Sequence, residues 1–110
     1  MNNRFKFRVW DEVNNKFYSQ EVLNALPLDV FLASKHIQQY TGLKDKNGKD
    51  IYEGDIIEMT YDHIIERGFV VWENNSYILK TIGEDSYAPL VIFPKDKVIG
   101  NIFENKELLK

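Results

Sequence analysis

The stretch from residue 39 to residue 57, QYTGLKDKNGKDIYEGDII, constrains the fold more than any other part of the chain. At its centre is Asn47-Gly48, the dipeptide most typical of tight β-hairpin turns, because both residues readily adopt positive φ. Apolar and aromatic residues stand on both sides of it, which is the pattern of two strands joined by a turn. The stretch therefore predicts a hairpin, and its second arm continues into a strand at Asp55.

The register of this hairpin is open. A two-residue turn would place Leu43 opposite Tyr52, which is a favourable apolar pair, but it would also place Asp45 opposite Asp50. Like charges directly opposite each other destabilise a strand pair, so the alternative is a longer loop, with a bulge near Gly42.

Residues 4–10, RFKFRVW, alternate between two kinds of side chain, which predicts a half-buried strand. Phe5 and Phe7 would face the core, whereas the bases and Trp10 would face the other way. We interpret it as an edge strand whose bases discourage edge-to-edge pairing, followed by a hairpin partner at residues 16–19. Trp10 would then be exposed, or covered by another element or subunit.

Downstream of the central stretch, short strand-like runs recur every 8–12 residues and are separated by turn residues, which is typical of a small barrel or sandwich. Residues 62–63 and 73–75 are predicted bends, residues 83–89 a loop, and residues 104–110 a polar tail or one helical turn. Residues 27–36 predict a short helix that begins at Pro27.

The predicted fold is therefore mainly β with a minor helical element (α+β). Residues 1–110 form one domain, in which an N-terminal hairpin, the helix and the linking hairpin (1–50) pack on a small antiparallel barrel like that of Src-homology-3 domains (51–104).

Composition narrows the function. The chain has no cysteine and no long apolar run, so we expect a cytoplasmic protein without a disulfide framework or a membrane segment. Residues 1–50 carry eight bases and six acids, whereas residues 51–110 carry six bases and eleven acids. An acidic balance disfavours general phosphate binding, although Arg4, Lys6 and Arg8 on one strand keep a nucleic-acid-binding barrel as an alternative.

Acidic residues cluster in and after the central stretch, and a pair of carboxylates could hold a divalent cation or serve as general acid and base. A metal-dependent hydrolase using the acids near Tyr52 is therefore a second alternative, although strand geometry would spread these acids over two faces. The candidates are Asp45, Asp50, Glu53, Asp55 and Glu58. No nucleophile motif, phosphate-binding loop or cofactor fingerprint accompanies them, so we predict no cofactor and no enzymatic activity.

Three motifs together resemble the YopX family of small phage and prophage proteins. They are FKFRVWD at residues 5–11, the central stretch at 39–57, and VIGNIFEN at 98–105. The resemblance implies a phage or prophage protein in the host cytoplasm that self-assembles into a homo-oligomer and binds an unknown phage or host protein. It assigns no catalytic residue. The candidate interaction or family-motif residues are Trp10, Tyr40, Gly42, Tyr52, Glu53, Gly54, Asp55, Gly100 and Asn101.

Overall fold

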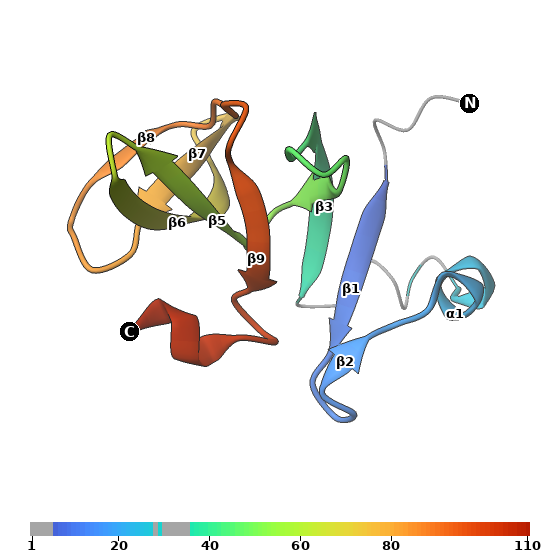
Figure 1. Cartoon of the computed structure of the whole chain (residues 1–110). Helices are drawn as coiled ribbons and strands as arrows, with labels where there is room; N and C mark the ends of the chain where they lie inside the picture. Colours follow the sequence, from blue (N-terminus) through green and yellow to red (C-terminus); the bar gives the residue numbers. More distant parts are fainter. Residues whose placement is uncertain (1–5, 28, 30–35) are drawn as a thin grey trace.

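The computed structural model describes residues 6–27, 29 and 36–110, which form two antiparallel sheets, a short helix and a 3-10 turn (Figure 1). The first sheet has the order β2-β1-β3-β4 and consists of β1 (Phe7–Asp11), β2 (Lys16–Phe17), β3 (Ile37–Lys44) and β4 (Asp50–Tyr52). The second has the order β8-β7-β6-β5-β9 and consists of β5 (Asp55–Tyr61), β6 (Ile64–Glu73), β7 (Ser76–Thr81), β8 (Tyr87–Pro89) and β9 (Lys97–Asn101).

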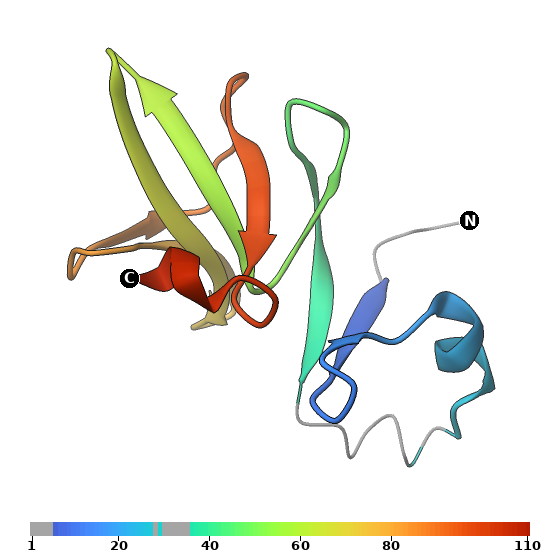
Figure 2. The ribbon, with the colours of Figure 1, turned by 60° about the horizontal axis from the view of Figure 1, so that its bottom comes forward.

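The second sheet curls into a half-barrel, and the mainly β fold with a minor helical element is confirmed. The two sheets stand side by side, with β3 and β9 next to each other across the junction (Figures 1 and 2).

Two tight turns connect the strands of the half-barrel. Asp62 (φ 49°) and His63 (φ 66°) join β5 to β6, and Asn74 (φ 52°) and Asn75 (φ 64°) join β6 to β7. Two-residue hairpins need positive φ at both central positions, and Asn and Asp tolerate this conformation better than most residues. The bends expected at these places are confirmed.

The core lies inside the half-barrel. Its buried members come from both sheets, since Ile51 belongs to β4 whereas Ile57, Val70 and Leu79 belong to β5, β6 and β7. Full burial of an aliphatic side chain contributes about 1.5–3 kcal/mol, so Ile51 attaches the first sheet firmly to the second. Partly buried residues pack around this core: Met59, Tyr77, Leu90, Ile92 and Val98.

The central hairpin has a longer loop than two residues. Lys44 pairs with Asp50 and Tyr40 pairs with Tyr52, with an irregular register between them. The pairing of Leu43 with Tyr52 is therefore wrong, and the alternative of a longer, irregular loop is confirmed. The like charges do not oppose each other, because the strands separate after Lys44 and the loop spans residues 45–49.

The N-terminal strand is not an edge strand, contrary to the prediction. β1 lies between β2 and β3, and both of its faces are covered, since Val9 is 1% and Trp10 is 5% exposed. Trp10 stacks on Phe103 with ring centroids 5.6 Å apart and meets the edge of Phe17 at 4.9 Å. Of the two alternatives for Trp10, coverage by another element is the correct one.

The helical predictions had mixed outcomes. The helix predicted at residues 27–36 lies largely outside the described residues. A different helix, α1 (Gln20–Ala25), begins after Ser19, whose side chain accepts a hydrogen bond from the Val22 N–H. The prediction missed it because six residues carry too little periodicity. The final turn, η2 (Lys106–Leu109), confirms the helical alternative for the tail.

The loop predicted at residues 83–89 is only partly a loop, because Tyr87–Pro89 pairs with β7 as the edge strand β8. Among the described residues, no helix has the length and apolar character needed to cross a membrane.

Candidate functional site at the junction of the two sheets

The chain crosses from the first sheet to the second at Gly54, where three segments come into close contact. The Gly54 N–H donates to the Val70 carbonyl at 2.8 Å, and the Gly54 carbonyl accepts from the Ile102 N–H at 2.9 Å. Gly54 has a φ of 81°, and a Cβ atom at this position would collide with the Gln38 side chain. Both the conformation and the close approach therefore require glycine here.

Four polar side chains meet beside Gly54, and we call them the junction network: Arg8, Gln38, Asp55 and Asn101. They come from β1, β3, β5 and β9, so the network joins the two sheets.

The carboxylate of Asp55 is the centre of the network and is 1% exposed. Its Oδ1 accepts hydrogen bonds from Arg8 Nη2 and, at 3.3 Å, from Asn101 Nδ2, while its Oδ2 accepts from the Tyr52 N–H at 2.8 Å. Gln38 Oε1 accepts from Arg8 Nε at 2.8 Å and from Asn101 Nδ2 at 3.1 Å. A buried charge is costly unless it is paired and hydrogen-bonded, and Asp55 meets both conditions.

Aromatic rings hold the guanidinium of Arg8 in place. Its Cζ lies 4.4 Å from the ring centroid of Phe17 and 4.5 Å from that of Tyr52, within the range of cation–π attraction. Burial raises the pKa of the Tyr52 hydroxyl, which therefore stays neutral beside the network. The planar guanidinium thus donates hydrogen bonds to one carboxylate and one side-chain amide and contacts two aromatic rings inside the protein.

The VIGNIFEN motif forms a turn that closes the junction. The Asn101 N–H donates to Asn105 Oδ1 at 3.0 Å, and the Phe103 N–H donates to Asn101 Oδ1 at 2.9 Å. A Cβ atom on Gly100 would lie 2.6 Å from Asn105 Oδ1, so the glycine leaves room for this side chain. The motif therefore orients Asn101 toward Asp55.

Most of the residues singled out in the sequence gather at or around this junction: Trp10, Tyr40, Tyr52, Glu53, Gly54, Asp55, Gly100 and Asn101. Glu53 Oε1 accepts the Gln39 N–H at 3.1 Å, and the Tyr40 and Tyr52 rings lie 5.6 Å apart. Gly42 does not join them, because it is exposed in β3 with φ 88°, and a Cβ atom added there would meet open space.

Sequence reasoning missed the roles of Arg8, Gln38 and Asn105. The sequence pattern shows Arg8 only as a base on an amphipathic strand, and nothing in it pairs Arg8 with Asp55, which lies 47 residues away. Asparagine stands at both ends of the segment 101–105, and asparagine side chains often hydrogen-bond the backbone of a turn, so this pattern could have predicted the turn.

The remaining acids of the central region have separate partners. Asp50 accepts hydrogen bonds from Lys44 and Lys6, each at 2.5 Å, and these bonds hold the pKa of its carboxyl below the usual value. Glu58 forms ion pairs with two bases: its Oε2 lies 3.7 Å from Arg67 Nε, and its Oε1 lies 3.6 Å from Lys97 Nζ.

Asp45 organises the loop of the central hairpin. Its carboxylate accepts N–H groups of Asn47 and Lys49 within the loop and of Val98 in β9, each at 2.9 Å. Burial alone would raise the pKa of the Asp45 carboxyl, but the hydrogen bonds from the three N–H groups outweigh it, so the pKa lies below the usual value.

These positions bear on both alternatives from the sequence. Across the described part of the chain, no three histidine or acidic side chains come together as a metal site would require, and the acids near Tyr52 serve structural contacts. Of the three bases, Arg4 lies outside the described residues, whereas Lys6 and Arg8 are ion-paired with Asp50 and Asp55, which reduces their capacity to neutralise phosphates. Neither the hydrolase nor the nucleic-acid alternative gains support from these contacts.

Comparison with known proteins identifies a solved structure with a similar fold and a sequence family to which the chain belongs. The chain superposes on the crystal structure of protein EF1440 from Enterococcus faecalis with a TM-score of 0.62 and 24% sequence identity, covering 96% of this chain and 97% of that one. At this identity the likeness concerns the fold alone. A search of curated proteins finds no match. The sequence model of the YopX protein family matches residues 25–110, which include two of the three motifs and all of the junction network except Arg8, and the chain therefore belongs to the YopX family.

Proposed function

We propose that this protein is a non-enzymatic accessory protein of a bacteriophage or prophage, which acts in the host cytoplasm by binding protein and forms a homo-oligomer. Membership of the YopX family supports the phage-type origin. The polar side chains at the junction have their hydrogen bonds satisfied within the fold, so their geometry supports a structural role rather than a catalytic one.

The observation that carries the binding role is an apolar surface at the open end of the half-barrel, which we call the open-end patch: Tyr61, Ile64 and Phe93. These side chains are 51%, 53% and 62% exposed, and Tyr61 pairs with Ile64 across the β5–β6 turn. A hollow of about 580 Å³ adjoins the patch and is lined by Met59, Thr60, Tyr61, Phe93, Pro94, Lys95 and Asp96.

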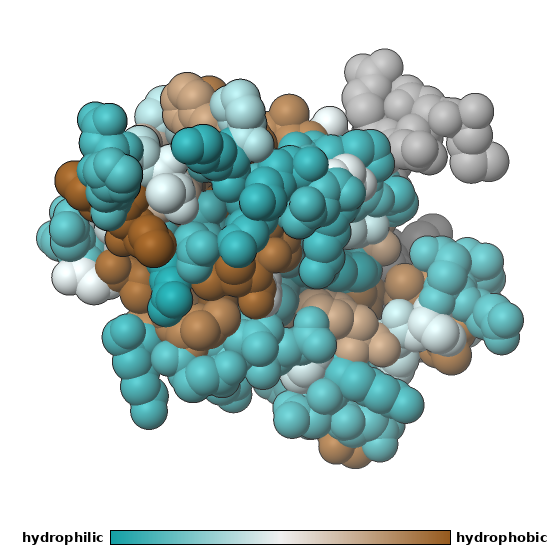
Figure 3. Space-filling model, viewed as in Figure 1, coloured by the Kyte–Doolittle hydropathy of each residue, from teal (hydrophilic) through white to brown (hydrophobic). Residues whose placement is uncertain are grey.

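Large apolar side chains gathered beside a hollow mark interaction surfaces more often than isolated exposed ones do. The space-filling view also shows broader hydrophobic areas over the five-stranded sheet than around α1 and β2 (Figure 3). A second copy is the occupant we propose, because a two-fold dimer joins the same patch on both subunits and places apolar surface against apolar surface.

Light scattering coupled to gel filtration tests this function. We expect the wild-type protein to elute with a mass above 13.0 kDa at micromolar concentration, and the double variant Ile64→Ser/Phe93→Ser to elute closer to the monomer. The control Val13→Ser/Leu109→Ser removes two exposed apolar side chains elsewhere and should keep the wild-type mass. A wild-type monomer at high micromolar concentration would refute self-association, and equal masses for both double variants would refute the role of the patch.

A further inference from the structure

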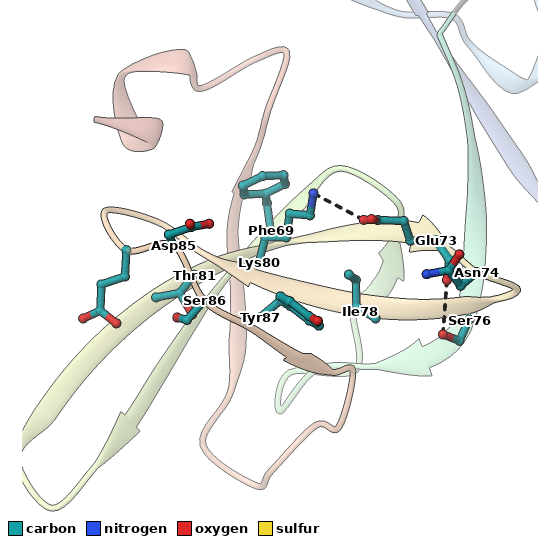
Figure 4. A pocket seen from close by; sticks show the side chains of 11 residues that line it. Phe69, Glu73, Asn74, Ser76, Ile78, Lys80, Thr81, Asp85, Ser86 and Tyr87 are labelled. Carbon is teal, nitrogen blue, oxygen red and sulfur yellow. Dashed lines mark hydrogen bonds and ion pairs between the residues drawn. The ribbon is translucent and has the colours of Figure 1, made fainter.

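A second surface lies on the opposite face of the same sheet, where strand pairing places Phe69, Lys80 and Tyr87 side by side on β6, β7 and β8. They line a hollow of about 570 Å³ together with Ile78 and the 84–86 loop (Figure 4). Because side chains of a strand alternate between faces, this hollow points away from the core residues Val70 and Leu79. It is therefore distinct from the open-end patch.

The charges around the hollow are unbalanced. Lys80 Nζ lies 3.2 Å from Glu73 Oε2, so this cation and this anion satisfy each other. Among the described residues, no cation lies within ion-pair distance of Glu84 or Asp85, whose side chains belong to the same rim. Three carboxylates against one ammonium leave the hollow with a net charge of −2.

The floor of the hollow suits a long cationic side chain. Phe69 and Ile78 are partly buried, and Tyr87 is 74% exposed, so its ring has free surface. Lysine and arginine lay their aliphatic stems along apolar surface while the charged head stays in water or reaches an anion, and aromatic faces attract cations. The rim acids Glu84 and Asp85 supply the anions.

We propose that this acidic hollow binds a lysine or arginine side chain of a partner protein, with the stem against Phe69 and Tyr87 and the cationic head near Glu84 and Asp85. Charge complementarity selects this partner: the hollow is anionic, and the half of the chain that contains it carries a net charge of −5, from six bases and eleven acids in residues 51–110. The partner is thus a basic protein segment, and the contact does not depend on self-association through the open-end patch.

The test uses the full chain labelled with ¹⁵N and three octapeptides, rich in lysine, arginine or glutamate. We expect both basic peptides to shift the amide signals of residues 69, 78 and 84–87, the glutamate peptide to shift none of them, and affinity to fall several-fold between 50 and 500 mM salt because exposed charges are screened. The variant Glu84→Gln/Asp85→Asn should bind the basic peptides roughly five- to tenfold more weakly, in line with the small contribution of each exposed ion pair.

Two further variants make the outcome decisive. Tyr87→Ala should weaken binding several-fold without a change of charge, whereas Glu21→Gln/Glu104→Gln removes two exposed acids elsewhere and should bind like the wild type. Shifts spread over other acidic surfaces, or equal binding by the rim variant and this control, would overturn the proposal.

Light scattering, combined with the peptide titration, separates the acidic hollow from the open-end patch. If the rim variant, Glu84→Gln/Asp85→Asn, has a lower mass in light scattering than the wild-type protein, the occupant of the hollow is a second copy and the proposal as stated is overturned. If the mass is unchanged while peptide binding is lost, the acidic hollow acts independently of self-association.

Discussion

Replacing the guanidinium of Arg8 with an apolar end tests whether the junction network holds the two sheets together. In Arg8→Met the apolar stem remains, but Asp55 loses its cation while it is only 1% exposed. It keeps the Tyr52 N–H at 2.8 Å and Asn101 Nδ2 at 3.3 Å, so the carboxylate is undercompensated rather than bare.

Breaking a buried ion pair by removing one partner costs roughly 3–5 kcal/mol. The Arg8 side chain is 18% exposed, so solvent reaches part of the site and the lower end applies. We therefore expect a loss of about 3 kcal/mol in the free energy of unfolding. With a urea m-value of about 2 kcal/mol/M, the midpoint of unfolding should fall by about 1.5 M.

Urea unfolding at pH 7 followed by tryptophan fluorescence measures this loss, since Trp10 is buried in the first sheet and Trp72 lies in the second. Asp55→Asn removes the buried charge, so the double variant Arg8→Met/Asp55→Asn should be more stable than the sum of the single losses predicts. Strict additivity, or a loss below about 0.5 kcal/mol for Arg8→Met, would refute the assignment of the pair as a buried, coupled contact.

Two further predictions concern backbone conformation and pH. Gly54→Ala should lower the melting temperature more than Gly83→Ala. Both glycines have positive φ, which alone costs an alanine about 1–2 kcal/mol, but only at Gly54 would the added Cβ collide with another side chain. Equal melting temperatures for the two variants would contradict the close approach at Gly54. The carboxyl groups of Asp45 and Asp50 have depressed pKa values in the folded protein, so they stabilise the folded state at any pH above their unfolded-state pKa near 3.8. This stabilisation is lost as the pH falls through their lower folded-state pKa values. The variant Asp45→Asn/Asp50→Asn should therefore lose less stability than the wild type between pH 6 and pH 2.5 in urea titrations, and an unchanged loss would show that other acids dominate.

Much of the local structure could be read from the sequence. The turns at residues 62–63 and 74–75 carry the Asn, Asp and His residues that positive φ requires or tolerates, and the flanking strands have the expected β-branched and aromatic content. The motifs alone also singled out their glycines and their Asn and Asp residues, and most of these lie at the junction. Short-range chemistry determines such features, because each depends on a few neighbouring residues.

The sequence by itself thus determined the β-rich class, the hairpins and the family, whereas only the tertiary structure decided what covers each strand. Residues 4 and 5 lie outside the described residues, but over residues 6–10 the alternation could not show that Arg8 meets Asp55 of the second sheet, or that Trp10 meets Phe103 in the turn after β9, rather than solvent. A strand pattern records which side chains share a face, and the partner of that face is set by contacts such as Arg8 with Asp55 and Trp10 with Phe103, which span 47 or more residues of chain. The central stretch could likewise predict a hairpin but not its register, because Asp45 is satisfied by the distant Val98 N–H as well as by its own loop.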